Sequence, residues 1–211
     1  LERAVYAASG ASPAPLVIDT SDPTALEKAL KAADGKVLIN SVNGEAKSLA
    51  NVLPLARRYG AAVIGLALDE DGIPDTAEGR VAVASRIHEA VLAAGLPEQD
   101  LVIDCLTLTV SAEQKRALET LRTLRMVRDQ LGLATALGVS NISFGMPSRP
   151  ILSSVFFAMA LEAGLDVAII NPKDQRMMDA YRSAMVLLGY DLRAESYITN
   201  YADQAAPMPE A

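Results

Sequence analysis

Two stretches of this chain carry the same residues, LVID, at positions 16–19 and 101–104. Each is a run of branched apolar residues typical of a buried strand, and each ends in a carboxylate, Asp19 or Asp104. A buried carboxylate is costly unless a partner binds it or its pKa rises. The repetition therefore suggests that both side chains lie at a rim where a ligand can meet them.

Other apolar runs also end in polar residues. Asn40 follows VLI, and Asn141 follows TALGVS; Asp69 and Asn171 follow two further runs. Carboxylates accept hydrogen bonds, and carboxamides both accept and donate them. If the ends of these runs meet on one face of the protein, the set could bind one shared polar ligand.

The runs themselves indicate strands that are buried on both faces, because none of them alternates polar with apolar residues. They lie at 16–20, 37–41, 62–68, 101–106, 135–141 and 167–171. The segments between them have helix signals, including Asp22 before Pro23 and a capping box of Ser111 and Gln114. Glycines are expected to end four of these helices, at positions 60, 95, 132 and 164.

Six successive strand–helix units favour either a doubly wound sheet or a (β/α)8 barrel. A doubly wound sheet usually has a glycine-rich turn after its first strand, whereas this chain continues with DTSDP. We therefore expect an α/β fold of the barrel type, with the polar residues at its active-site face. A full barrel has eight strands, so the barrel should be incomplete, and residues 1–10 resemble the end of a preceding helix.

An incomplete barrel would expose two apolar sheet edges. We therefore expect the isolated chain to be poorly stable or to self-associate, for example as a homodimer.

The composition limits other partners: the net charge is −7 and no cluster of Lys or Arg is present, which disfavours nucleic acid and anionic membranes. The single cysteine excludes an internal disulfide, and no signal peptide or membrane span is apparent, so we expect a cytoplasmic protein.

Several segments together resemble a known family. They are LVIDTSDPTALEKAL, VLINSVNGE, RRYGAAVIGLALDEDGIPDT, GLPEQDLVIDCL, ALGVSNISFGMPSRP and GLDVAIINP. From about Ala14 to about Tyr201 the chain is similar to the pterin-binding barrel of methyltetrahydrofolate methyltransferases, a family that shares the dihydropteroate-synthase type of barrel. That family includes the folate domain of cobalamin-dependent methionine synthase and the methyltetrahydrofolate:corrinoid protein methyltransferases.

The resemblance implies a domain organisation and a reaction. Residues 1–201 would form the barrel domain, beginning near its third strand, and 202–211 a tail or linker. The domain would transfer the methyl group of 5-methyltetrahydrofolate to Co(I) of a corrinoid (cobalamin) held by another domain or partner protein. The alternative is a remnant that binds folate or a partner without catalysis, because truncation would remove part of the pocket wall.

By resemblance, Asp19, Asn40 and Asp104 match the positions that hold the pterin. The aminopyrimidinone edge of a pterin has N–H donors that suit carboxylates and a carbonyl that suits a carboxamide. The simpler interpretation is that Asp19 and Asp104 only cap the helices or loops that follow them. Gly138 and Ser140 would let backbone and hydroxyl groups approach the ligand.

By resemblance, Asn141 matches the family position that promotes the rate of methyl transfer. The leaving group is a tertiary amine, and an amide donor whose hydrogen bond strengthens in the transition state would assist its departure. The alternative is an asparagine that simply adopts a turn after a strand. Arg149 either binds the benzoyl-glutamate tail or pairs with a carboxylate at the start of the next helix.

Other chemistries have less support. Dihydropteroate synthase-like displacement of pyrophosphate needs cations, but no basic residue follows Ser140 before Arg149. The only histidine, His88, lies inside an expected helix at 76–94, and Cys105 should point into the packing, so no metal site is predicted. A glycosidase using paired carboxylates would need aromatic sugar platforms, and the chain has no Trp. Asn43 and Glu45 could touch a ligand but are more typical of an exposed loop.

Overall fold

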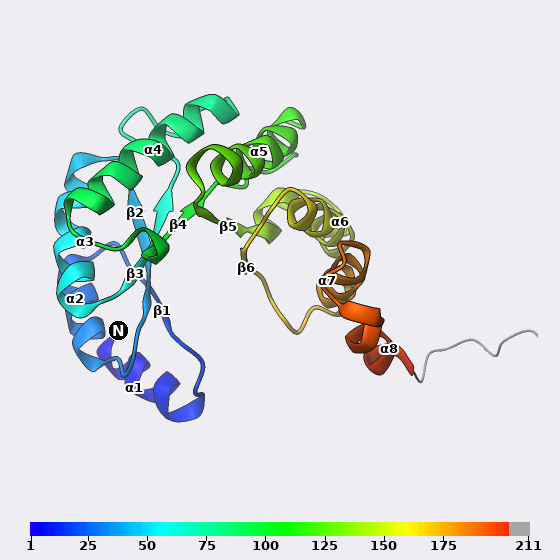
Figure 1. The fold of residues 1–211 in the computed structure, drawn as a ribbon, viewed down its shortest axis with the longest axis horizontal. Coiled ribbons are helices and arrows are strands. Elements are labelled where there is room, and N and C mark those ends of the chain that lie inside the picture. The colour runs from blue at the N-terminus through cyan, green and yellow to red at the C-terminus, as the bar shows by residue number, and fades with distance from the viewer. Residues whose placement is uncertain (203–211) are drawn as a thin grey trace, which may run out of the picture.

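The computed structural model describes residues 1–202. Its six strands form one parallel sheet in chain order, with helices connecting successive strands (Figure 1). The strands are Val17–Asp19 (β1), Leu38–Asn43 (β2), Ala62–Leu66 (β3), Leu101–Asp104 (β4), Ala134–Gly138 (β5) and Val167–Ile169 (β6). The helices are Glu2–Ala11 (α1), Pro23–Ala32 (α2), Ala46–Tyr59 (α3), Ala77–Ala93 (α4), Lys115–Met126 (α5), Arg149–Glu162 (α6), Gln175–Leu187 (α7) and Glu195–Tyr201 (α8). A π-helical turn, Val127–Leu131, extends α5.

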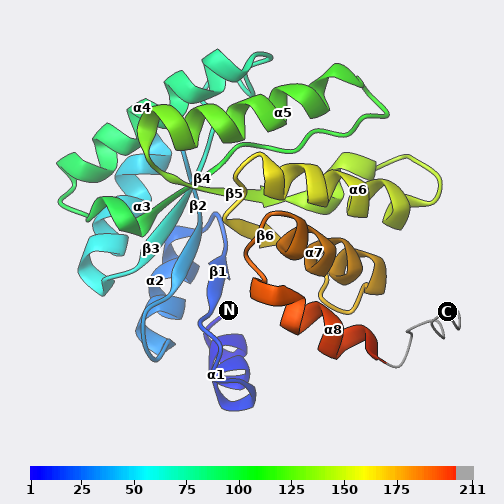
Figure 2. The same cartoon turned by 45° about the vertical axis from the view of Figure 1, so that its right-hand side comes forward.

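The sheet is curved, and the helices cover its convex face (Figure 2). Neighbouring strands place Ile18, Ile39, Val63 and Leu101 in one register row. These side chains are at most 3% exposed, so this row belongs to the core between sheet and helices. Because successive residues of a strand face opposite sides, the residues that alternate with this row line the concave face.

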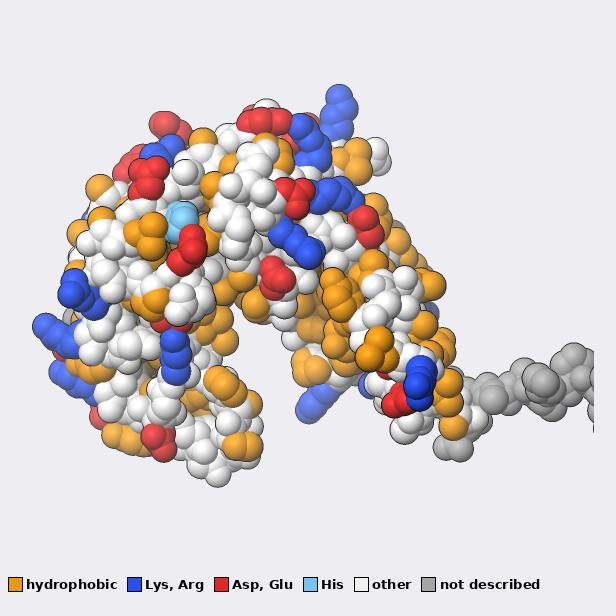
Figure 3. All heavy atoms as spheres, in the orientation of Figure 1, with side chains coloured by type: hydrophobic (Ala, Val, Ile, Leu, Met, Phe, Trp, Pro, Cys, Tyr) orange, Lys and Arg blue, Asp and Glu red, His pale blue; other side chains and the backbone are white. Residues whose placement is uncertain are grey.

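The barrel does not close. Strands β1 and β6 are the two ends of the sheet, and the arch between them is open in Figure 1 and hollow in the space-filling view of Figure 3. Val17 is 53% exposed and Ile169 is 44% exposed on these end strands. A (β/α)8 barrel has eight strands, so six strands in this arrangement form an incomplete one. This confirms the predicted fold class.

Several predicted helix ends are confirmed. The Asp22 side chain accepts a hydrogen bond from Thr24 N (2.8 Å), and Pro23 is the first residue of α2. Gly60 and Gly132 end α3 and the π-helical turn in the left-handed conformation, with φ of 64° and 67°. Glycine suits these positions because it lacks the Cβ atom that disfavours positive φ.

The capping box at Ser111 is wrong. Helix α5 begins later, at Lys115, and its N-cap Gln114 makes no capping hydrogen bond through its side chain. The Ser111 hydroxyl instead donates to the backbone oxygen of Phe144 (2.8 Å) in the loop after β5. A contact between distant loops therefore replaces the local cap.

Helix α6 and strand β6 account for the apolar stretch 151–170. Across residues 1–202, none of the helices has both the length and the apolar character that a membrane span requires. The predicted tail or linker, 202–211, lies outside the described residues except for Ala202.

Candidate functional site

The strand register brings three predicted ligand-binding residues to the concave face. Asp19 lies beside Asn40, and Asn40 lies beside Ile64 of β3. Two residues further along β3, Leu66 lies beside Asp104. Residues two apart on a strand face the same side, so Asp19, Asn40 and Asp104 share one face at the carboxyl ends of their strands.

Asp19 and Asn40 are in direct contact. The Asn40 amide nitrogen Nδ2 donates a hydrogen bond to Asp19 Oδ2 (3.2 Å). Asp19 is exposed and Asn40 is half-buried, so both can be reached from the hollow of the arch. The pair leaves one carboxylate oxygen and the Asn40 carbonyl oxygen as acceptors for a ligand.

Asp104 is different because its side chain is buried. The residue is 8% exposed, and its Oδ1 accepts a hydrogen bond from Leu106 N (2.8 Å). Burial raises the pKa of Asp104 to about 6, although the Leu106 bond acts in the opposite direction. Within residues 1–202 no hydrogen bond reaches Oδ2 and no cation pairs with the carboxylate. Asp104 therefore caps the following loop with one oxygen and keeps the other for a donor.

Asn141 and Gly138 are also adjacent. Asn141 lies in the 3₁₀ turn Val139–Ser143 directly after β5, and it is exposed. A Cβ atom at Gly138 would lie 2.9 Å from Asn141 Nδ2, which means that the amide folds back over the end of β5. Gly138 has an ordinary negative φ of −75°, so this close approach is the reason that a glycine fits there. Gly138 shares the face of Ala136, which lies beside Asp104.

Arg149 supports the loop that carries Asn141. Its Nη2 donates to the backbone oxygen of Ser140 (3.1 Å) and its Nε to Ser143 Oγ (3.1 Å). The guanidinium carbon lies 4.3 Å from the centre of the Phe144 ring, which is a cation–π contact. Among the described residues no carboxylate pairs with Arg149, so the expected alternative of a carboxylate partner is not what the structure contains.

The remaining residues singled out in the sequence lie away from this face or hold local structure. Asn43 Oδ1 accepts a hydrogen bond from Glu45 N (3.1 Å) at the start of α3. Both residues line a cavity of about 380 Å³ between the ends of β1 and β2 and helices α2 and α3. His88 lies on α4 as predicted, with its Nε2 2.8 Å from Glu98 Oε1, and Cys105 is fully buried, as expected for a packing residue. In the described part of the chain, no three His, Cys, Asp or Glu side chains gather as a metal site would require.

One buried polar residue near the site was missed from the sequence. Arg80 lies on α4 and is fully buried, and it bonds to the loop that follows Asp104. The sequence contains a signal for this position, because the apolar residues Ala77, Ala84 and Ile87 lie at helical intervals from Arg80. All three are buried in the structure. A charged residue on the apolar face of a helix can be found in this way, although its contacts cannot.

Comparisons with known proteins agree with this geometry. The sequence model described as "Pterin binding enzyme" matches residues 2–171. The chain is 36% identical to methionine synthase of Mycobacterium leprae and 33% identical to that of Mycobacterium tuberculosis; each match covers 87% of this chain and only 17% of the relative. It is 28% identical to methylcorrinoid:tetrahydrofolate methyltransferase of Eubacterium limosum, covering 87% of this chain and 69% of that protein.

Solved structures share the fold. A Yersinia pestis dihydropteroate synthase with a pterine-sulfa conjugate has a TM-score of 0.69 at 15% identity, over 90% of this chain and 74% of that one. The 7,8-dihydropteroate synthase of Vibrio fischeri ES114 has a TM-score of 0.69 at 16% identity, over 89% and 73%. At these identities the likeness concerns the fold alone, whereas the sequence match extends over most of the chain. The chain belongs to the pterin binding enzyme family.

Proposed function

We propose that this chain is a methyltransferase domain that binds 5-methyltetrahydrofolate and transfers its methyl group to a corrinoid held by another domain or a partner protein. The names of its relatives support this reaction: two are methionine synthases and one is a methylcorrinoid:tetrahydrofolate methyltransferase. Because the chain spans 17% of the methionine synthases, the other steps of such an enzyme would belong to other domains.

The observation that carries the proposal is the shared face of Asp19, Asn40 and Asp104. A reduced pterin presents an exocyclic amine, a ring N–H and a carbonyl along one edge. The free oxygen of the Asp104 carboxylate can accept from an N–H donor of this edge, and the contact would replace the hydration that Asp104 has lost by burial. Asp19 and Asn40 supply further acceptors and an amide on the same face, on strands β1 and β2. Ser140 and the remaining guanidinium donors of Arg149 are the proposed contacts for the rest of the folate.

Asn141 is the proposed catalytic residue. Its amide nitrogen is held over Gly138 at the end of β5, and its side chain makes no hydrogen bond to another residue within 1–202. When the methyl group leaves, the folate nitrogen keeps the electron pair of the broken C–N bond and gains a proton from solvent, because an amide cannot supply one. A hydrogen-bond donor placed at this nitrogen binds the transition state more strongly than the ground state. One such donor is typically worth about 2.7–4 kcal/mol. The corrinoid would supply the Co(I) nucleophile that takes the methyl group.

Dihydropteroate synthase chemistry is the less favoured reaction despite the shared fold. Displacing pyrophosphate calls for cationic side chains near the leaving group. The turn after β5 contains Ser140, Asn141 and Ile142 instead, and Arg149 already uses two of its donors, Nε and Nη2, on Ser143 and Ser140. A folate-binding remnant without catalysis stays the alternative, because two strand positions of the barrel are not filled.

The test uses Asn141→Ala in the natural polypeptide context, compared with Asp104→Ala. We expect Asn141→Ala to bind 5-methyltetrahydrofolate with nearly unchanged affinity but to transfer methyl about 100- to 1,000-fold more slowly. Asp104→Ala should lose affinity instead. Binding without any methyl transfer by the wild type would support the remnant, and an unchanged rate in Asn141→Ala would remove this residue from the mechanism. Cytoplasmic location and homodimer formation stay predictions.

A further inference from the structure

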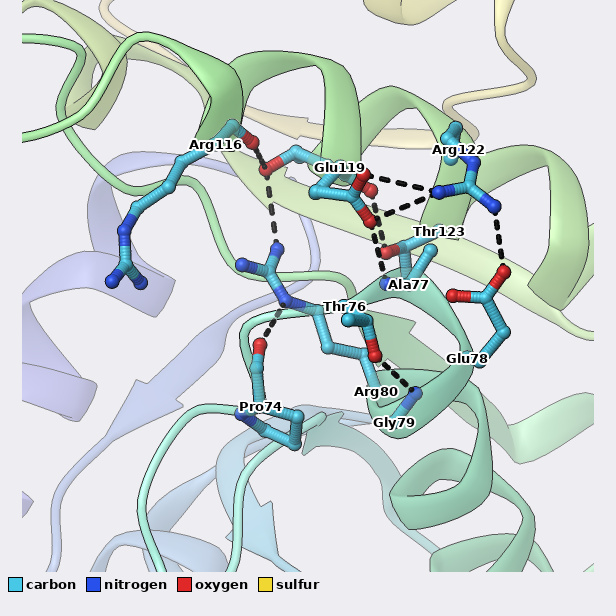
Figure 4. Close-up of polar contacts among 11 residues, drawn as sticks. Pro74, Thr76, Ala77, Glu78, Gly79, Arg80, Arg116, Glu119, Arg122 and Thr123 are labelled. Carbon is cyan, nitrogen blue, oxygen red and sulfur yellow. Dashed lines mark hydrogen bonds and ion pairs between the residues drawn. The ribbon is translucent and has the colours of Figure 1, made fainter.

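Arg80 connects two loops at the active-site end of the barrel. Its Nη1 lies 3.0 Å from the backbone oxygens of both Cys105 and Leu106 and 3.3 Å from Thr120 Oγ1. Its Nε donates to the backbone oxygen of Pro74 (3.0 Å), which Figure 4 shows at the opposite side of the guanidinium. The side chain thus joins the loop after β3, the loop after β4 and helix α5.

A purely structural role does not account for Arg80, because its burial is unfavourable for the stability of the fold. It is fully buried, and burial lowers the pKa of its guanidinium. Within residues 1–202, its Nη2 has no hydrogen-bond partner and no carboxylate lies within ion-pair distance of the group. A buried cation without a counter-charge destabilises a fold. Packing alone therefore does not explain an arginine at this position.

The contacts of Leu106 connect Arg80 with the binding face. Leu106 has a φ of 62°, in the left-handed region that residues with a Cβ atom rarely adopt. Its carbonyl oxygen accepts from Arg80 Nη1 and from Thr120 Oγ1 (3.0 Å). Its N–H donates to Asp104 Oδ1 (2.8 Å). Both polar groups of Leu106 are thus fixed, one by Arg80 and Thr120 and the other by the buried carboxylate.

We propose that Arg80 is a positioning residue for Asp104: by binding the Leu106 carbonyl it keeps the Leu106 N–H on Asp104 Oδ1 and leaves Oδ2 free for the ligand. The inference rests on the proposed function for the identity of that ligand, a reduced pterin. The positioning itself can be observed without any ligand, because the Leu106 bond stabilises the ionised carboxylate and its loss must raise the pKa of Asp104.

The first experiment is a carboxyl ¹³C NMR titration of the chain without ligand, with the Asp104 resonance assigned from Asp104→Asn. We expect Arg80→Met to move the Asp104 midpoint to higher pH. The matched control is Arg122→Met, because Arg122 of α5 also contacts α4, through Glu78 (2.6 Å), but at the surface; its other ion pair, with Glu119 (3.0 Å), lies within α5 (Figure 4). It should leave the midpoint where the wild type has it.

The second experiment measures binding of 5-methyltetrahydrofolate against pH. Arg80→Met should bind about tenfold more weakly at pH 7, and its binding profile should shift to higher pH in parallel with the NMR midpoint. If the wild type does not bind folate, the proposed function fails while the titration still decides the role of Arg80.

A folded Arg80→Met with the wild-type Asp104 midpoint would overturn the inference. If Arg80→Met does not fold, Arg80→Lys and Thr120→Val replace it. Arg80→Lys keeps the charge but loses the fork between Pro74 and Leu106, and Thr120→Val removes the other donor to Leu106. Unchanged midpoints in both variants would be equally decisive against it, and an upward shift in either would support it.

Discussion

Replacing Asp104 with asparagine should make the folded chain more stable at neutral pH while it weakens pterin binding. The substitution removes a buried negative charge that has no cationic partner among the described residues. An asparagine Oδ1 can still accept the hydrogen bond from Leu106 N that Asp104 Oδ1 accepts at 2.8 Å. The local loop is therefore kept, and only the charge is lost.

The size of the effect follows from the pKa. Burial raises the pKa of Asp104 from 3.8 to about 6. A shift of roughly two units corresponds to about 3 kcal/mol of lost stability when the group is ionised. The sign depends on pH. Below about 4 the carboxyl is protonated in both folded and unfolded states, and the penalty is absent. The penalty grows as pH rises from about 4 to 6, where only the unfolded state loses its proton, and it is complete above about 7.

The assay is urea unfolding of the wild type and Asp104→Asn at pH values from 4.5 to 8, followed by far-UV circular dichroism. The difference in unfolding free energy should increase with pH and level off near 3 kcal/mol in favour of the variant. Asp129→Asn is the control, because Asp129 is exposed on the π-helical turn. The reasoning is refuted if Asp104→Asn is no more stable than the wild type at pH 7.5, or if the difference does not change with pH.

Three further predictions concern the same face and its support. Pterin binding by the wild type should weaken as pH falls through about 6, because Asp104 becomes protonated, and a binding titration of Asp104→Asn should lack this dependence. Gly138→Ala should slow methyl transfer with little change in the free energy of unfolding in urea. The added Cβ would lie 2.9 Å from Asn141 Nδ2 and would therefore displace the amide. Ile103→Ala, on the helix-facing side of β4, should lower the unfolding free energy by about 2–5 kcal/mol, and thermal unfolding would detect this.

The strands could be predicted from the sequence because their signal is local. LVID at 16–19 and at 101–104 reads as a buried run ending in a polar residue, and both runs do end β1 and β4 at Asp19 and Asp104. The shared face then follows from period-two alternation and the regular register of parallel strands. The selection of Asp19, Asn40 and Asp104 among the polar strand ends depends in addition on the family resemblance, because Asp69 and Asn171 also follow strand-like runs.

Contacts between distant loops could not be predicted in this way. Ser111 has the sequence of a helix cap, but its hydroxyl bonds to Phe144, 33 residues away. Arg80 contacts Leu106, 26 residues away, and a charged residue inside a helical pattern is normally expected at the surface. Both cases depend on which loops meet at the end of the barrel, and that arrangement is a property of the folded chain.

The two faces of the sheet therefore have different roles: the helix-facing side stabilises the fold, and the concave side carries the proposed ligand contacts. Ile39 and Val63 face the helices and are fully buried, whereas Asn40 and Asp104 face the hollow of the arch. A carboxylate on the helix side would have no ligand to compensate its loss of hydration. On the concave side, the cost of burying Asp104 can be recovered when N–H donors bind it, so the free energy that destabilises the empty site becomes part of the selectivity for a ligand with those donors.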